Sequence, residues 1–104
     1  MFARVTTFEG PPEQVEAAMA IYREEVVPWL KDATGFRGWI VLVDRERGRT
    51  MGLTFWATEE AMTDEETSGA VLRDDLAASL GIEMTSLEFF EVVAVAALAL
   101  DEIV

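Results

Sequence analysis

The fold is decided by the stretch GWIVLVDRERGRTMGLTFW, residues 38–56. Trp39–Val43 is apolar at every position, which predicts a strand that is covered on both faces. Residues 44–48 are charged and end in Gly48, a residue free to take the positive φ of a hairpin loop. Thr50–Trp56 is predicted as the next strand. Two strands joined by so short a loop must run antiparallel.

The residues before this hairpin predict a strand and a helix. Phe2–Phe8 alternates and is rich in Val, Thr and Phe, as a strand requires. Gly10-Pro11-Pro12 then stops the strand and starts a helix, because proline suits the first helical turn. Pro28 should bend or end that helix near its last turn. The apolar stripe with helical spacing consists of Val15, Ala18, Met19, Tyr22, Val26, Trp29 and Leu30.

The residues after the hairpin predict a second helix and a last strand. Thr58 can cap a helix that begins at Glu59, and Thr63–Glu66 fits a capping box at which the helix can restart. Gly81 supplies the stop, and Thr85–Val95 is predicted as the last strand. The resulting βαββαβ order is the ferredoxin-like α+β fold, an antiparallel four-stranded sheet with two helices on one face.

Chain length and hydrophobic content predict one domain that pairs with a copy of itself. The 104 residues fit a single domain, 1–104, and 51% of them are hydrophobic. A domain this small buries only about two-thirds of the surface of its unfolded chain. The two helices leave one sheet face open, and no third layer is available to cover it. A homodimer joined sheet to sheet would cover that face.

The charge balance excludes some classes of partner. Asp and Glu number 20 against 8 Lys and Arg, which gives a net charge of −12. Such a surface repels phosphate backbones and anionic lipids, so we expect neither a nucleic-acid nor a membrane partner. No apolar run reaches the roughly 20 residues that span a bilayer, and the N-terminus lacks a signal-peptide layout. We therefore expect a cytoplasmic location.

The chain contains neither cysteine nor histidine. Disulfides, thiolate nucleophiles and a Ser-His-Asp triad are thereby excluded. The commonest ligands of haem iron and zinc are also missing, so we expect no cofactor and no metal. A site made of carboxylates alone stays open, although no spacing in the sequence favours one.

Three segments resemble the antibiotic biosynthesis monooxygenase-like (ABM) family of dimeric α+β barrels. They are GFRG (35–38), LTFWATEEA (53–61) and SLEFFEV (86–92), and the resemblance extends over Met1–Val95. It implies a cleft between helices and sheet in each subunit. The family includes cofactor-independent monooxygenases that act on polycyclic aromatic phenols. Its haem-degrading branch uses an Asn, Trp and His set, and this chain has neither asparagine nor histidine.

Three residues are candidates for ligand binding. Tyr22, the only tyrosine, can hold a phenolate or orient a carbonyl with its hydroxyl, or simply be a buried ring. Trp56 ends a strand, where clefts open, and its alternative role is packing. Arg4 lies inside a strand, and a buried arginine must be paired. Either it pairs with Glu88 or Glu91 as a structural ion pair, or it clamps an anionic ligand.

Two functions remain open from the sequence. The first is a small cofactor-independent monooxygenase-like protein that acts on or binds an aromatic, quinone-like molecule. The second is a non-catalytic ligand-binding or structural dimer. The arrangement of Tyr22, Trp56 and Arg4 separates them: one closed cavity lined by all three favours the first, and a solid core favours the second.

Overall fold

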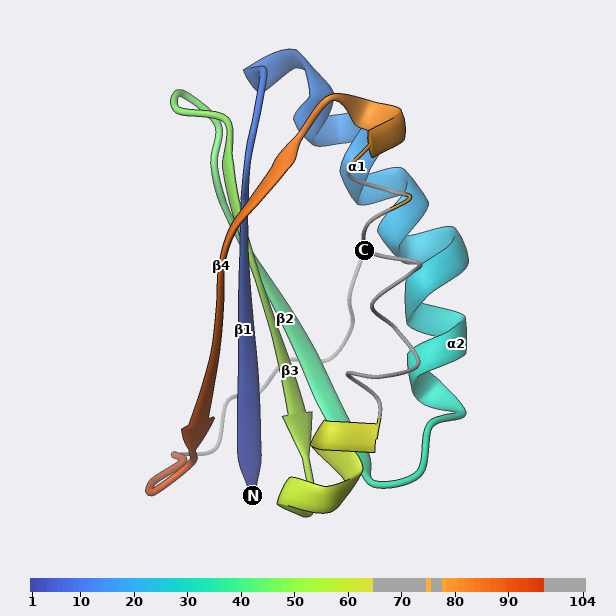
Figure 1. The fold of residues 1–104 in the computed structure, drawn as a ribbon, viewed down its shortest axis with the longest axis vertical. Helices are drawn as coiled ribbons and strands as arrows, with labels where there is room; N and C mark the ends of the chain where they lie inside the picture. Colours follow the sequence, from blue (N-terminus) through green and yellow to red (C-terminus); the bar gives the residue numbers. More distant parts are fainter. Residues whose placement is uncertain (65–74, 76–77, 97–104) are drawn as a thin grey trace.

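A computed structural model describes residues 1–64, 75 and 78–96. Four antiparallel strands form one sheet in the order β2-β3-β1-β4, and the helices lie on one side of it (Figure 1). The strands are β1 (Phe2–Glu9), β2 (Phe36–Asp44), β3 (Arg49–Trp56) and β4 (Glu83–Glu91). This is the predicted α+β, ferredoxin-like arrangement, with β1 and β4 as neighbours.

The helical segment after β1 widens before Pro28. It comprises a 3-10 turn (Pro12–Gln14), α1 (Val15–Ile21), a π-helical turn η2 (Tyr22–Val26) and α2 (Val27–Lys31). Pro28 has no N–H and cannot complete an ordinary helical turn. The preceding residue, Val27, donates its N–H to the carbonyl of Tyr22, five positions back. The helical segment therefore continues past Pro28, where the sequence predicts a bend or an end, and stops at Lys31.

The hairpin between β2 and β3 is fixed against the end of β1. Gly48 has a φ of +64°, as predicted, and its carbonyl accepts the N–H of Gly10 at 3.0 Å. A Cβ atom on Gly48 would stand 1.9 Å from the carbonyl oxygen of Gly10. Arg45 forms an ion pair with Glu16, which joins the hairpin to α1. Two segments that are distant in the sequence are thus held together by backbone contact.

The second helix begins where the sequence predicts. The hydroxyl of Thr58 accepts the N–H of Ala61 at 3.1 Å, and residues 59–64 are helical. The predicted restart at Thr63–Glu66 extends beyond the described residues. Residues 78–80 are helical again, and Gly81 ends the turn with a φ of +66°.

The last strand differs from the prediction at both ends. Thr85–Val95 was expected, whereas β4 runs from Glu83 to Glu91. The N–H of Val92 donates to the carbonyl of Met1 at 2.9 Å. This is the last bond of the pair because β1 itself starts at Phe2. The apolar residues after Val92 are predicted as strand by the sequence, but none of the four described strands pairs with them.

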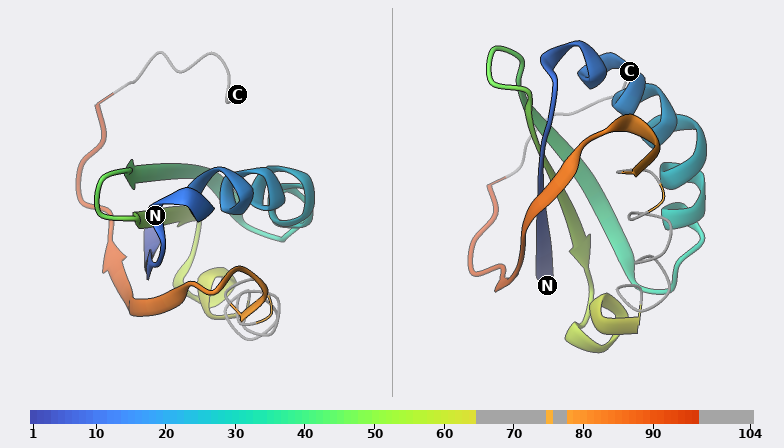
Figure 2. Two further views of the ribbon diagram at one scale, coloured as in Figure 1. Left: turned by 90° about the horizontal axis from the view of Figure 1, so that it is seen from above. Right: turned by 45° about the horizontal axis from the view of Figure 1, so that its top comes forward.

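The two faces of the sheet differ in their cover. Figure 2 shows α1, α2 and residues 59–64 on one side and residues 92–96 leaving β4 on the other. The core on the helical side contains Trp56, Leu30, Val26 and Met62. The opposite side, the open face, is apolar at its centre. By strand alternation it presents Ala3, Val5, Ile40, Leu42, Met51, Leu53, Phe55 and Phe90.

None of the helices among the described residues combines the length and apolar content that crossing a membrane requires.

Two glycines give a matched test of the hairpin contact. Gly81→Ala should destabilise the protein by about 1–2 kcal/mol, the cost of an alanine in the left-handed region, because nothing lies within 4 Å of its added Cβ. Gly48→Ala has the same backbone cost plus the collision with Gly10, so we expect roughly 3–4 kcal/mol. Urea unfolding measures both. Equal losses would mean that the Gly10–Gly48 contact does not constrain the fold.

Candidate functional site

One row of side chains crosses the helical side of the sheet. Arg4 on β1 lies directly opposite Thr54 on β3, and Thr54 lies opposite Trp39 on β2. Arg4 and Thr54 are each only 3% exposed. These three residues, the Arg4 row, place a cation and a hydroxyl inside what is otherwise an apolar layer. Such groups are stable there only with polar or aromatic neighbours.

Trp56 is joined to this row by two contacts. Its indole N–H donates to the hydroxyl of Thr54 at 2.9 Å. The guanidinium carbon of Arg4 lies 6.0 Å from the centre of the indole, at the limit of a cation–π contact. The ring of Phe36 meets Trp56 edge to face at 5.5 Å. With an exposure of 0%, Trp56 is a core residue, and this is the packing alternative that the sequence left open.

Tyr22 reaches the same row from the helical layer. Its ring stacks on Trp39 with the centroids 5.4 Å apart and the planes 5° from parallel. Its hydroxyl lies 3.5 Å from the position that a Cβ of Gly52 would take. Tyr22 therefore faces the sheet, as the apolar stripe predicted. Arg4, Trp56 and Tyr22 each belong to the Arg4 row or contact one of its members.

The two carboxylates predicted as partners of Arg4 lie on different faces. Glu88 is opposite Val5 and so points to the open face, away from Arg4. Glu91 is opposite Phe2 and shares the face of Arg4. The prediction of Glu88 as a partner is therefore wrong, because neighbouring residues of a strand point to opposite sides of the sheet.

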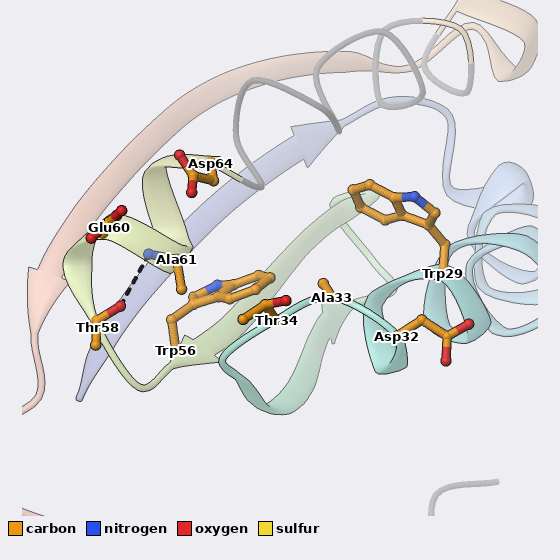
Figure 3. Close-up of a pocket in the computed structure, with 9 residues that line it drawn as sticks. All are labelled: Trp29, Asp32, Ala33, Thr34, Trp56, Thr58, Glu60, Ala61 and Asp64. Atoms are coloured by element: carbon orange, nitrogen blue, oxygen red, sulfur yellow. Dashed lines mark hydrogen bonds between the residues drawn. The ribbon is translucent and has the colours of Figure 1, made fainter.

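A cavity of about 610 Å³ opens beside Trp56. Figure 3 shows Trp29 on α2 at one end and Trp56 at the other, with the turn residues Ala33 and Thr34 between them. Residues 58–64 form the remaining described wall. The described lining consists of Trp29, Asp32, Ala33, Thr34, Trp56, Thr58, Glu60, Ala61 and Asp64.

A second cavity, of about 20 Å³, lies between α1 and the sheet. Tyr22 lines this one together with Phe8 and Val15, whereas Trp56 lines the larger one. Arg4 is not among the described lining residues of either. The expectation that all three candidates share one cavity does not hold for these two cavities. Their roles in ligand binding stay predictions.

Sequence reasoning missed most of the larger cavity. The sequence pattern does not connect Asp32, Glu60 or Asp64 with a pocket. The carboxylates are the only titratable side chains in the described lining, and each is exposed. They can accept or return a proton. Among the described residues, no three carboxylates gather closely enough to hold a metal ion.

Two curated relatives come from Mycobacterium tuberculosis, and both are uncharacterized. Rv2558 is 38% identical over 74 residues, which is 71% of this chain and 31% of that protein. Rv2557 is 33% identical over 81 residues, which is 78% of this chain and 36% of that protein. The chain thus spans about a third of the length of these relatives. No protein-family model matches the chain.

Three solved structures share the architecture. A monooxygenase from Streptomyces coelicolor, ActVA-Orf6 in complex with Nanaomycin D, has a TM-score of 0.71 at 18% identity, covering 94% of this chain and 92% of its own. A structure described as an antibiotic biosynthesis monooxygenase has a TM-score of 0.68 at 15% identity, with 90% and 100% covered. SnoaB, a cofactor-independent oxygenase from Streptomyces nogalater, has a TM-score of 0.62 at 17% identity, with 90% and 94% covered.

At these identities the likeness concerns the backbone arrangement and not the chemistry. The strand order, the helices on a single sheet face and the cavity beside a strand-end tryptophan are now established for the described residues. The chain has the fold of the antibiotic biosynthesis monooxygenase family.

Proposed function

We propose that this protein is a cofactor-independent, monooxygenase-like protein that binds a small aromatic, quinone-like molecule between Trp29 and Trp56. The observation that carries the proposal is the cavity of about 610 Å³ that has the indoles of Trp29 and Trp56 among its lining residues. Ligand cavities of about 300–1,000 Å³ are typical for small molecules. Flat aromatic ligands stack on indole faces, and Trp29, which is 37% exposed, offers such a face, whereas the fully buried Trp56 closes the cavity behind it.

The charges around the cavity favour a ligand that arrives neutral. Asp32, Glu60 and Asp64 would repel a phenolate, and no cation belongs to the described lining. Arg4, the candidate anion clamp, is buried beside Trp56. A neutral ring that carries hydroxyl groups can instead donate hydrogen bonds to the carboxylates. The carboxylates then become the groups that accept a proton from it.

Cofactor-free oxygenation requires few catalytic groups from the protein. The bound substrate loses a proton and reacts with O₂ itself. When a ring CH₂ becomes C=O, one oxygen atom enters the product and the other leaves as water, so no external reductant is needed. The protein supplies a proton acceptor and a cavity from which bulk water is displaced. The likeness of the fold to a cofactor-independent oxygenase supports this reading.

Non-catalytic binding of the same kind of ligand is the second candidate. It is favoured by the absence of Tyr22 and Arg4 from the described lining of the cavity, because no neutral hydroxyl or cation from that pair can then steer the reaction. Oxygen uptake separates the two functions. An oxygenase accelerates O₂ consumption by an anthrone above the protein-free rate, and a binding protein does not.

We also propose that two copies associate through the open face. Leu42 and Phe90 on this face are 51% and 49% exposed, an unusual position for large apolar side chains in a monomer. The face is apolar at its centre, and a second copy offers the same surface.

Trp29→Ala tests the ligand site. Trp29 is 37% exposed, so its removal should leave the fold intact and weaken binding of 1,4-naphthoquinone by about tenfold, the effect of one stacking partner. Equilibrium dialysis measures the affinity. Met84→Ala is the matched control, because Met84 is also 37% exposed and does not line the cavity. An equal loss in both variants, or none in Trp29→Ala, would contradict the proposal.

Trp56→Ala should behave differently from Trp29→Ala. Trp56 is fully buried and bonded to Thr54, so its truncation should lower the free energy of unfolding by about 3–5 kcal/mol. Thermal or urea unfolding gives the loss directly. A loss below about 1 kcal/mol would show that the ring is not part of the core.

Leu42→Lys tests the association. Sedimentation should give twice the 11.5 kDa of the chain for the wild type at micromolar concentration, and a shift toward the single-chain mass for the variant. A charge placed on the apolar face must lose its hydration when the copies meet. Ala17→Lys, at an exposed position of α1, is the control and should stay associated. A wild type that sediments as a single chain would refute the association.

A further inference from the structure

The indole N–H of Trp39 is a buried donor without an acceptor among the residues that the structure describes. An indole nitrogen can only donate a hydrogen bond. Folded proteins rarely leave such a buried donor without an acceptor, because the N–H loses its hydrogen bonds to water and gains none in return. The buried N–H of Trp39 therefore indicates that this side chain is positioned to bind an acceptor from outside the described residues.

The neighbouring tryptophan shows that an acceptor is within reach of the row. Trp56 donates to the hydroxyl of Thr54 at 2.9 Å, and Thr54 lies directly opposite Trp39 in the Arg4 row. That hydroxyl serves Trp56, while Trp39 makes no such bond. Two indoles that flank one threonine are thus treated differently. Trp56 is hydrogen-bonded within the core, and the N–H of Trp39 has no acceptor in the described part of the chain.

The surroundings of Trp39 are suited to a flat ligand. Tyr22 already stacks on the indole in a nearly parallel arrangement. The next position along β3 on this side is Gly52, so the sheet below the Tyr22 hydroxyl presents backbone and no side chain. Tyr22 begins the π-helical turn Tyr22–Val26. Single π-helical turns occur often at functional sites, where they place a side chain that a regular helix would turn elsewhere.

We propose that Trp39 donates its indole N–H to a carbonyl oxygen of the aromatic ligand. Trp39 then distinguishes a ring that carries a carbonyl from the same ring without one. Thr54 lies between the cavity and Trp39. Its hydroxyl accepts a hydrogen bond from Trp56, which lines the cavity, and Thr54 lies opposite Trp39 on the neighbouring strand. Trp39 is not among the described lining residues of either cavity and its N–H is buried, so the ligand reaches it only when neighbouring side chains such as the stacked Tyr22 move aside. The inference rests on the proposed aromatic ligand but concerns a different residue.

The test uses Trp39→Phe and a pair of probes. 1,4-Naphthoquinone carries two carbonyl groups, and naphthalene has the same ring system with none. In equilibrium dialysis, the wild type should prefer the quinone. Trp39→Phe keeps an aromatic ring for Tyr22 and loses the donor, so its quinone affinity should fall about five- to tenfold, the usual effect of one hydrogen bond. Its affinity for naphthalene should stay unchanged.

Two further measurements separate this role from a structural one. Trp39→Phe should keep or raise the melting temperature, because it removes a buried donor that has no acceptor among the described residues. Trp56→Phe, the matched control, should lower it, because the bond to Thr54 is lost. In ¹⁵N NMR spectra, the indole N–H of Trp39 should move downfield with the quinone and not with naphthalene.

The binding and melting measurements distinguish failure of the Trp39 inference from failure of the proposed function. A wild type that binds the quinone without preferring it to naphthalene overturns the inference, as does an unchanged preference in Trp39→Phe; in both cases the proposed function survives. A drop in the melting temperature of Trp39→Phe equal to that of Trp56→Phe shows that the N–H already has an acceptor, and this also overturns it. A wild type that binds neither probe overturns the proposed function and the inference together.

Discussion

The structure depends on how the sheet buries polar groups beneath its helices. Arg4 and Thr54 lie side by side at the centre of a layer that has lost its water. Trp56 contacts both, because its indole N–H donates to the Thr54 hydroxyl and its ring lies 6.0 Å from the Arg4 guanidinium carbon. This contact fixes Trp56 at the end of β3, and the position of Trp56 in turn fixes where the larger cavity begins.

Pro28 has a comparable influence from the helical side. Because it lacks an N–H, the preceding turn opens into the π-helical segment that begins at Tyr22. The same helix then carries Trp29 to the cavity, while Tyr22 rests on Trp39. The two aromatic side chains of this helical segment therefore have different surroundings, a sheet residue for Tyr22 and the cavity for Trp29.

The fold and the chemistry are supported to different degrees. Solved oxygenases share the backbone arrangement, but a common fold carries many functions, and the residues around the cavity are this chain's own. The proposed neutral aromatic ligand rests on the two indoles and three carboxylates of the described lining.

The sequence by itself determined what depends on neighbours along the chain. The hairpin, the positive φ of Gly48 and the cap at Thr58 each follow from a few adjacent residues. Tertiary structure decided what depends on register. It placed Glu88 away from Arg4, and it ended β4 at Glu91, where pairing with β1 stops. It also sent Tyr22 and Trp56 to separate cavities. The physical reason is that a shift of one residue in strand pairing reverses every side chain, and no local pattern records which residue lies opposite.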